Sequence, residues 1–74
     1  MKRKYKSLKQ IINYLKNIDN PLGDLCSDIL RDDSFPINDV EKAWEYLDHL
    51  VKFGRDYLYE PIIDLKTIYD IINK

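Results

Sequence analysis

Residues 20–36 read NPLGDLCSDILRDDSFP, and they carry the clearest structural signal in the chain. Asn20 is a favourable N-cap, Pro21 suits the first helical position, and Asp24 complements the positive end of a helix dipole. The apolar residues that follow recur at helical spacing: Leu22, Leu25, Cys26, Ile29 and Leu30. We expect one short amphipathic helix that ends at residues 32–34, followed by a corner in which Phe35 is buried.

Gly23 stands in the first turn of this expected helix. A glycine inside a helix costs about 1 kcal/mol relative to alanine, and less near an end. The residue therefore calls for a steric reason, and we expect it to allow the close approach of a neighbouring helix.

The sequence on the N-terminal side predicts a helix from about Ser7 to Asn17, with Ser7 as its N-cap. Its apolar stripe consists of Leu8, Ile11, Ile12 and Leu15. The Asp19-Asn20-Pro21 run ends it, because the residue before a proline disfavours the helical conformation.

Two further helices are expected on the C-terminal side. Asn38 and Glu41 form a capping-box pattern, which predicts a third helix that stops at Gly54. Its apolar face would comprise Val40, Ala43, Trp44, Leu47, Leu50 and Val51. Residues 55–60 read as a connector with a helical turn that holds Tyr57 and Leu58. Pro61 is expected to open the fourth helix, which points Ile62, Leu65, Ile68, Tyr69 and Ile72 inward.

The expected fold is all-α: a compact, orthogonal arrangement of four short helices rather than a long bundle. Seventy-four residues make one domain. We assign residues 1–6 to a basic N-terminal segment and residues 7–74 to a single helical domain. One cysteine excludes an internal disulfide and favours a reducing compartment. No secretory or membrane-spanning apolar run is present, so we expect a cytoplasmic protein that does not engage a membrane.

Several segments resemble the YozE-like family of small bacterial proteins, whose fold is similar to that of sterile alpha motif domains. Residues 20–25 (NPLGDL) are similar to a family segment often written Asp-Pro-Ile-Gly-Asp-Leu-Ala, and residues 32–36 (DDSFP) to its Asp-x-x-Phe-Pro corner. Residues 7–15 correspond to its first helix, and residues 44–47 (WEYL) fall where the family has a Tyr-Leu pair. Leu8 and Lys9 depart from its usual aromatic residues, and Cys26 from a small one. The resemblance implies a sterile-alpha-motif-like fold and no particular biochemical activity.

Residues that could carry chemistry are few. Asp28, Asp32 and Asp33 could form a cation site if their carboxylates met, but they more simply end the helix and form the corner. Cys26 lies on an apolar stripe and reads as a small buried hydrophobe rather than a nucleophile. His49 falls on the face opposite the apolar stripe of the third helix. We therefore expect no enzyme, no cofactor, no metal and no small-molecule substrate.

Charge is distributed unevenly along the chain. Residues 1–16 contain Lys2, Arg3, Lys4, Lys6, Lys9 and Lys16 and no acidic residue, whereas residues 19–48 contain nine Asp/Glu against Arg31 and Lys42. Two hypotheses follow. The preferred one is a non-enzymatic protein–protein interaction module that binds itself or another protein through these charged surfaces. The alternative is nucleic-acid binding by the basic segment, with Tyr5 and Tyr14 able to stack on bases.

The candidate interaction surface combines the charged residues at both ends of this asymmetry with two tyrosines that lie off the main apolar stripes. It consists of Lys2, Arg3, Lys4, Lys6, Lys9, Asp28, Asp32, Asp33, Tyr46 and Tyr59. Tyr and Trp are enriched at the energetic centres of interfaces. Trp44 is assigned to the core instead.

Overall fold

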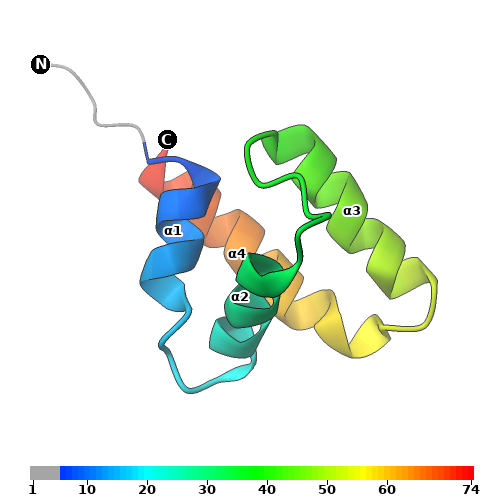
Figure 1. Cartoon of the computed structure of the whole chain (residues 1–74). Coiled ribbons are helices and arrows are strands. Elements are labelled where there is room, and N and C mark those ends of the chain that lie inside the picture. Colours follow the sequence, from blue (N-terminus) through cyan, green and yellow to red (C-terminus); the bar gives the residue numbers. More distant parts are fainter. Residues whose placement is uncertain (1–5) are drawn as a thin grey trace, which may run out of the picture.

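The computed structural model describes residues 6–74, which form an all-α fold with no strand among them (Figure 1). Its elements are α1 (Leu8–Leu15), α2 (Pro21–Arg31), α3 (Val40–Lys52), the 3₁₀ turn η1 (Asp56–Leu58) and α4 (Tyr59–Ile72). The expected all-α class and the helical turn in the third connector are confirmed.

The first and last helices lie close together at one end of the molecule (Figure 1). The side-chain amide of Asn73 accepts a hydrogen bond from the backbone N–H of Lys6 at 2.8 Å and donates one to the Lys6 carbonyl at 2.9 Å. Elsewhere α1 packs on α2, α2 packs on α4, and α3 packs on η1 and α4. The Asn73 amide therefore ties the entry of α1 to the end of α4.

Two of the predicted helix caps are confirmed. The Ser7 hydroxyl accepts from the backbone N–H of Gln10 at 3.2 Å, and the Gln10 side chain accepts from the Ser7 N–H at 2.9 Å, which completes a capping box. The Asn20 side chain accepts from the N–H of Gly23 at 2.9 Å, with Pro21 in the first helical position. Both caps satisfy amide groups that have no partner within the helix.

The predicted cap of the third helix is wrong by one residue. Asp39 is the N-cap of α3, and its carboxylate accepts from the N–H of Lys42 at 3.2 Å. Asn38 instead lies inside the turn after Phe35, where the N–H of Asp39 donates to the Pro36 carbonyl at 3.2 Å. Because Asn38 is part of this turn, it does not cap the helix. Asp39 has the extended backbone that an N-cap requires.

Two other boundaries differ from expectation. α1 ends at Leu15 rather than Asn17, because the N–H of Ile18 turns back to the Leu15 carbonyl at 3.0 Å. α4 begins at Tyr59, so that Pro61 is its third residue and not its first. Amides in the first turn of a helix have no intrahelical partner, so a proline is tolerated there without loss of a hydrogen bond.

Gly54 ends α3 as expected. Its φ is +109°, in the region that favours glycine. The N–H of Arg55 donates to the Leu50 carbonyl at 3.0 Å and that of Gly54 to the Val51 carbonyl at 3.4 Å. This pair of bonds is the Schellman motif, and it reverses the chain toward η1 and α4.

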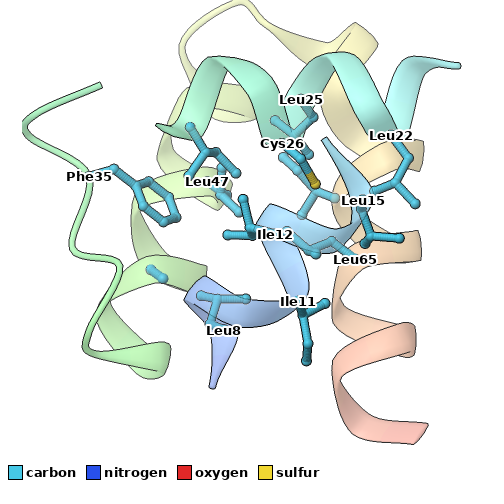
Figure 2. Packing of buried hydrophobic residues seen from close by; sticks show 13 residues of the cluster. Leu8, Ile11, Ile12, Leu15, Leu22, Leu25, Cys26, Phe35, Leu47 and Leu65 are labelled. Carbon is cyan, nitrogen blue, oxygen red and sulfur yellow. The ribbon is translucent and has the colours of Figure 1, made fainter. Parts of the chain in front are cut away.

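The four α-helices and the Phe35 corner share one core (Figure 2). Ile12, Cys26, Leu47 and Leu65 are fully buried, one from each helix, and Phe35 is only 7% exposed, which confirms its predicted burial. The buried side chains are Leu8, Ile11, Ile12, Leu15, Leu22, Leu25, Cys26, Ile29, Phe35, Ala43, Leu47, Ile62 and Leu65.

Several residues assigned inward lie at the edge of the core or outside it. Trp44 is half-buried and packs on the edge of the core, with its ring edge-on to Tyr69 at 5.8 Å between centroids. The prediction that Ile72 points inward is wrong, since the residue is 40% exposed. The last turn of α4 faces α1 across an open groove there, and the core does not reach it.

Gly23 serves a steric purpose, although not the expected one. A Cβ at residue 23 would lie 1.8 Å from the carbonyl oxygen of Ile18, in the connector between α1 and α2. The approaching group is therefore backbone of the connector rather than a neighbouring helix. A backbone atom cannot swing aside as a side chain would, so only glycine fits.

Gly23→Ala is expected to lower the free energy of unfolding by about 3 kcal/mol, because the connector must move to admit the methyl group. Gly54→Ala, whose new Cβ would have no atom within 4 Å apart from its chain neighbours, should cost about 1–2 kcal/mol of backbone strain. Urea unfolding followed by circular dichroism measures both. An equal or smaller loss for Gly23→Ala would contradict the close approach of the Ile18 carbonyl.

Candidate interaction surfaces

The basic surface is formed by α1 and its flanks. Lys6, Lys9 and Lys16 are exposed, and none of the three is ion-paired with the part of the chain that the structure describes. No acidic residue precedes Asp19 in the sequence, so the segment that forms α1 contributes only positive charge to this surface. Lys2, Arg3 and Lys4, with Tyr5, lie outside the described residues.

The three predicted aspartates do not form a common site. Asp28 is exposed and pairs with Arg31 one turn along α2, Asp33 is exposed, and Asp32 is half-buried at the end of the helix. Among residues 6–74 no group of three or more His, Cys, Asp or Glu side chains is placed to hold a metal ion. Asp28 and Asp33 remain available as surface charge.

Asp32 is joined to Tyr46, a pairing that sequence spacing does not reveal. The Tyr46 hydroxyl donates to the Asp32 carboxylate at 2.5 Å, and the backbone N–H of Ser34 donates to the same carboxylate at 2.9 Å. The Tyr46 ring stands edge-on to Phe35, with 5.3 Å between centroids. Through these contacts Tyr46 joins the Phe35 corner to α3. Its side chain is half-buried, so the expectation that it is exposed is not met.

This hydrogen bond shifts the pKa of both partners. The Tyr46 hydroxyl, followed by the Ser34 N–H, lowers the pKa of Asp32 because both donors favour the charged carboxylate. The same hydrogen bond raises the pKa of Tyr46, since a phenolate would lose it. At neutral pH the pair consists of a carboxylate and a neutral phenol.

Tyr59 is exposed, as expected, and has exposed aromatic neighbours at the corner between α3 and α4. The side chain of Tyr59 is 58% exposed, that of Tyr57 in η1 71% and that of Phe53 74%. Phe53 was not singled out in the sequence, because it follows the apolar stripe of α3 and its exposure depends on the turn at Gly54. Together with Tyr14, these three are the large exposed aromatic side chains of the described residues.

Cys26 and His49 occupy different environments. Cys26 lies in the core, and burial raises the pKa of its thiol to about 11, which disfavours the thiolate that a nucleophile requires. His49 is exposed on α3, with its ring 4.3 Å from that of Phe53. The residues do not form a Cys–His pair.

A groove between α1 and α4 is the feature that sequence reasoning missed. It has a volume of about 440 Å³ and is lined by Lys6, Gln10, Ile11, Tyr14, Leu15, Ile68 and Ile72. Tyr14 on its rim is 86% exposed. The only signal for it in the sequence is that Gln10 and Tyr14 share one face of α1, and that signal does not say which helix lies opposite.

Comparisons of the chain with protein-family models, with curated proteins and with solved structures gave no match. Within residues 6–74, no helix combines the length and the apolar character that crossing a bilayer requires. Function therefore has to be argued from the surfaces described above.

Tyr46→Phe removes the hydrogen bond to Asp32 and keeps the ring contact with Phe35. We expect the free energy of unfolding to fall by about 1 kcal/mol near neutral pH, the value for a partly exposed hydrogen bond to a charged group. Because folding lowers the pKa of Asp32, this contribution is present above the ordinary aspartate value of about 4 and is lost as pH falls through the lowered value. Urea unfolding at pH about 7 and about 2.5 should show the difference shrinking in acid.

Tyr59→Phe is the matched control, since it removes a hydroxyl from an exposed tyrosine. We expect no measurable change at either pH. A loss for Tyr46→Phe that persists undiminished at the lower pH would show that the charge on Asp32 does not contribute.

Proposed function

We propose that this protein is a small, non-enzymatic protein–protein interaction module that binds a second copy of itself or another protein through charged surfaces. The observation that carries the proposal is the separation of charge between α1, whose exposed lysines have no acidic neighbour in sequence, and the acid-rich region of α2 and α3. Oppositely charged surfaces steer partners together and disfavour mismatched ones.

The proposal includes membership of the YozE-like family and a sterile-alpha-motif-like, orthogonal arrangement of the helices. It is supported by the NPLGDL and DDSFP segments, which form the start of α2 and the corner after it. It also includes a cytoplasmic location, for which the single, buried Cys26 is the support.

The self-association form of the proposal places α1 of one copy against α2 and α3 of the next. Such a contact joins two different surfaces, so it repeats into open chains unless the geometry closes a ring. Asp28 and Asp33 are two of the exposed acids on the receiving side, and Lys9 and Lys16 are two of the exposed bases on the other.

Sedimentation velocity at about 50 mM and about 500 mM salt tests this form, because salt screens attraction between exposed charges. We expect chains of copies at low salt that dissociate at high salt. A Lys9→Gln/Lys16→Gln variant and an Asp28→Asn/Asp33→Asn variant should each be monomeric. Mixed in equal amounts, they should stop at a dimer, because each retains one intact surface.

A monomer at both salt concentrations, at high protein concentration, would eliminate self-association. The form with a different protein partner is then tested by affinity capture from the source cell, with one portion treated with nuclease. A protein retained by the wild type after nuclease treatment and lost from one charge variant supports it. If the nuclease-treated portion retains no protein, the proposed interaction module is overturned in both of its forms.

Nucleic-acid binding is the second candidate, favoured by exposed Lys6, Lys9 and Lys16 beside the exposed ring of Tyr14. Lysine contacts to phosphate confer affinity that falls with salt, and tyrosine rings stack on unpaired bases. The acidic α2–α3 region opposes it, since it would repel phosphate.

Fluorescence anisotropy with labelled single- and double-stranded DNA and RNA at about 50 mM salt tests this candidate. If it holds, affinity falls steeply as salt rises, and neutralising Lys2, Arg3, Lys4 and Lys6 together reduces it further. Asp28→Asn is the control, since it removes an acid and should strengthen binding slightly or leave it unchanged. No binding at micromolar protein would rule the candidate out.

A further inference from the structure

The groove between α1 and α4 lies outside the core and is largely apolar. Ile11 and Leu15 are buried at its floor, Ile68 is half-buried, and Ile72 and Tyr14 are exposed at its edges. In an isolated molecule water covers these edges, and covering them with another apolar surface would be favourable by about 25 cal/mol per Å². The groove is thus a preformed place for apolar side chains.

Two of the polar residues that line the groove are held in place by hydrogen bonds. The Gln10 side chain is already engaged in the α1 capping box, where it accepts from the Ser7 N–H. The backbone of Lys6 is held at the mouth of the groove by both hydrogen bonds to the Asn73 amide. The two bonds fix the backbone from which the lysine side chain extends. Its ammonium group is the one charge among those residues of 6–74 that line the groove.

The groove carries positive charge without a compensating acid in its walls. No Asp or Glu lies among its lining residues, and none precedes Asp19 in the chain. Asp70 on α4 lines a different hollow, together with Ile71 and Lys74. A partner that brings carboxylates to the rim would therefore be attracted and not repelled.

A symmetric contact with a second copy is disfavoured by the same charges. It would bring the Lys6 ammonium groups of two molecules onto grooves that have no acid among their described lining residues. The apolar faces of the four helices are also committed to the protein's own core, so no helix of a second copy is free to fill the groove. These observations favour a different protein, and not a second copy, as the occupant of the groove.

We propose that the α1–α4 groove binds an acidic amphipathic helix of a partner protein, an inference that rests on the interaction module proposed above. α1 has 8 residues and is therefore about 12 Å long. A helix laid in a groove presents its anchors at positions i, i+3 or i+4, and i+7, which span about 10 Å. The groove thus accommodates two turns of helix, with acidic residues of the partner facing Lys6.

The probe for this proposal is a designed helical peptide of about 14 residues, with leucines at i, i+3, i+4, i+7 and i+11 and glutamates at most other positions. The protein is small enough for two-dimensional ¹⁵N NMR titration of the full chain. We expect shift changes centred on Gln10, Tyr14, Leu15, Ile68 and Ile72. A peptide with the same composition in scrambled order, and one with lysine in place of glutamate, are the control ligands.

Ile72→Ser and Lys6→Glu should each weaken binding of the acidic peptide by about fivefold, the size expected for one exposed anchor or one rim charge. Ile71→Ser is the matched control, since Ile71 is the neighbouring residue, is 67% exposed and lines the other hollow. It should leave the affinity unchanged. Circular dichroism of each variant shows that the fold is retained.

Four outcomes would overturn the proposal: no binding, equal binding of the scrambled or lysine peptide, equal losses for Ile71→Ser and Ile72→Ser, or shifts in the groove that grow with protein concentration alone. The last would identify a second copy as the occupant. Binding confined to α2 and α3 would overturn the groove assignment and leave the interaction module standing. The sedimentation and capture experiments decide the module independently.

Discussion

The carbonyl oxygen of Ile18 lies where residue 23 would carry its Cβ, 1.8 Å from that position. Because Gly23 has no Cβ, the connector can turn from α1 into α2 tightly enough for both helices to reach the same core. Asn20 caps α2 within the same few residues, and its side chain bonds to the N–H of Gly23. The cap and the missing side chain therefore act together, and they shape the turn between two helices that contribute Ile12 and Cys26 to one core (Figure 2).

A chain of this size has one modest core, so contacts outside the core make up a larger share of its stability. The Asn73 amide joins the two ends of the described chain, and the Tyr46–Asp32 hydrogen bond joins the Phe35 corner to α3. The Schellman turn at Gly54 returns the chain toward α4. The first two contacts join segments that are distant in the sequence, and the third reverses the chain at the end of one helix.

The surfaces that remain are of two kinds. One is charge, positive over α1 and negative over α2 and α3, which is suited to steering a partner. The other is apolar, in the α1–α4 groove and the aromatic corner of Phe53, Tyr57 and Tyr59. The groove combines apolar surface with charge, because Lys6 at its mouth is the charged residue among its lining residues in the described part of the chain. Recognition by binding uses both kinds of surface, whereas the buried thiol of Cys26 offers little for covalent chemistry.

The helices could be predicted from sequence, as could the burial of Phe35, the caps at Ser7 and Asn20 and the stop at Gly54, because each follows from residue types a few positions apart. The separation of charge is also visible in the sequence. Four further features emerged from the folded chain: Asp39 caps α3, the Ile18 carbonyl faces Gly23, Tyr46 bonds to Asp32 and Ile72 borders a groove. Those outcomes depend on how the connectors turn and on which helices meet, and periodicity along the chain specifies a helix's faces without specifying what lies opposite them.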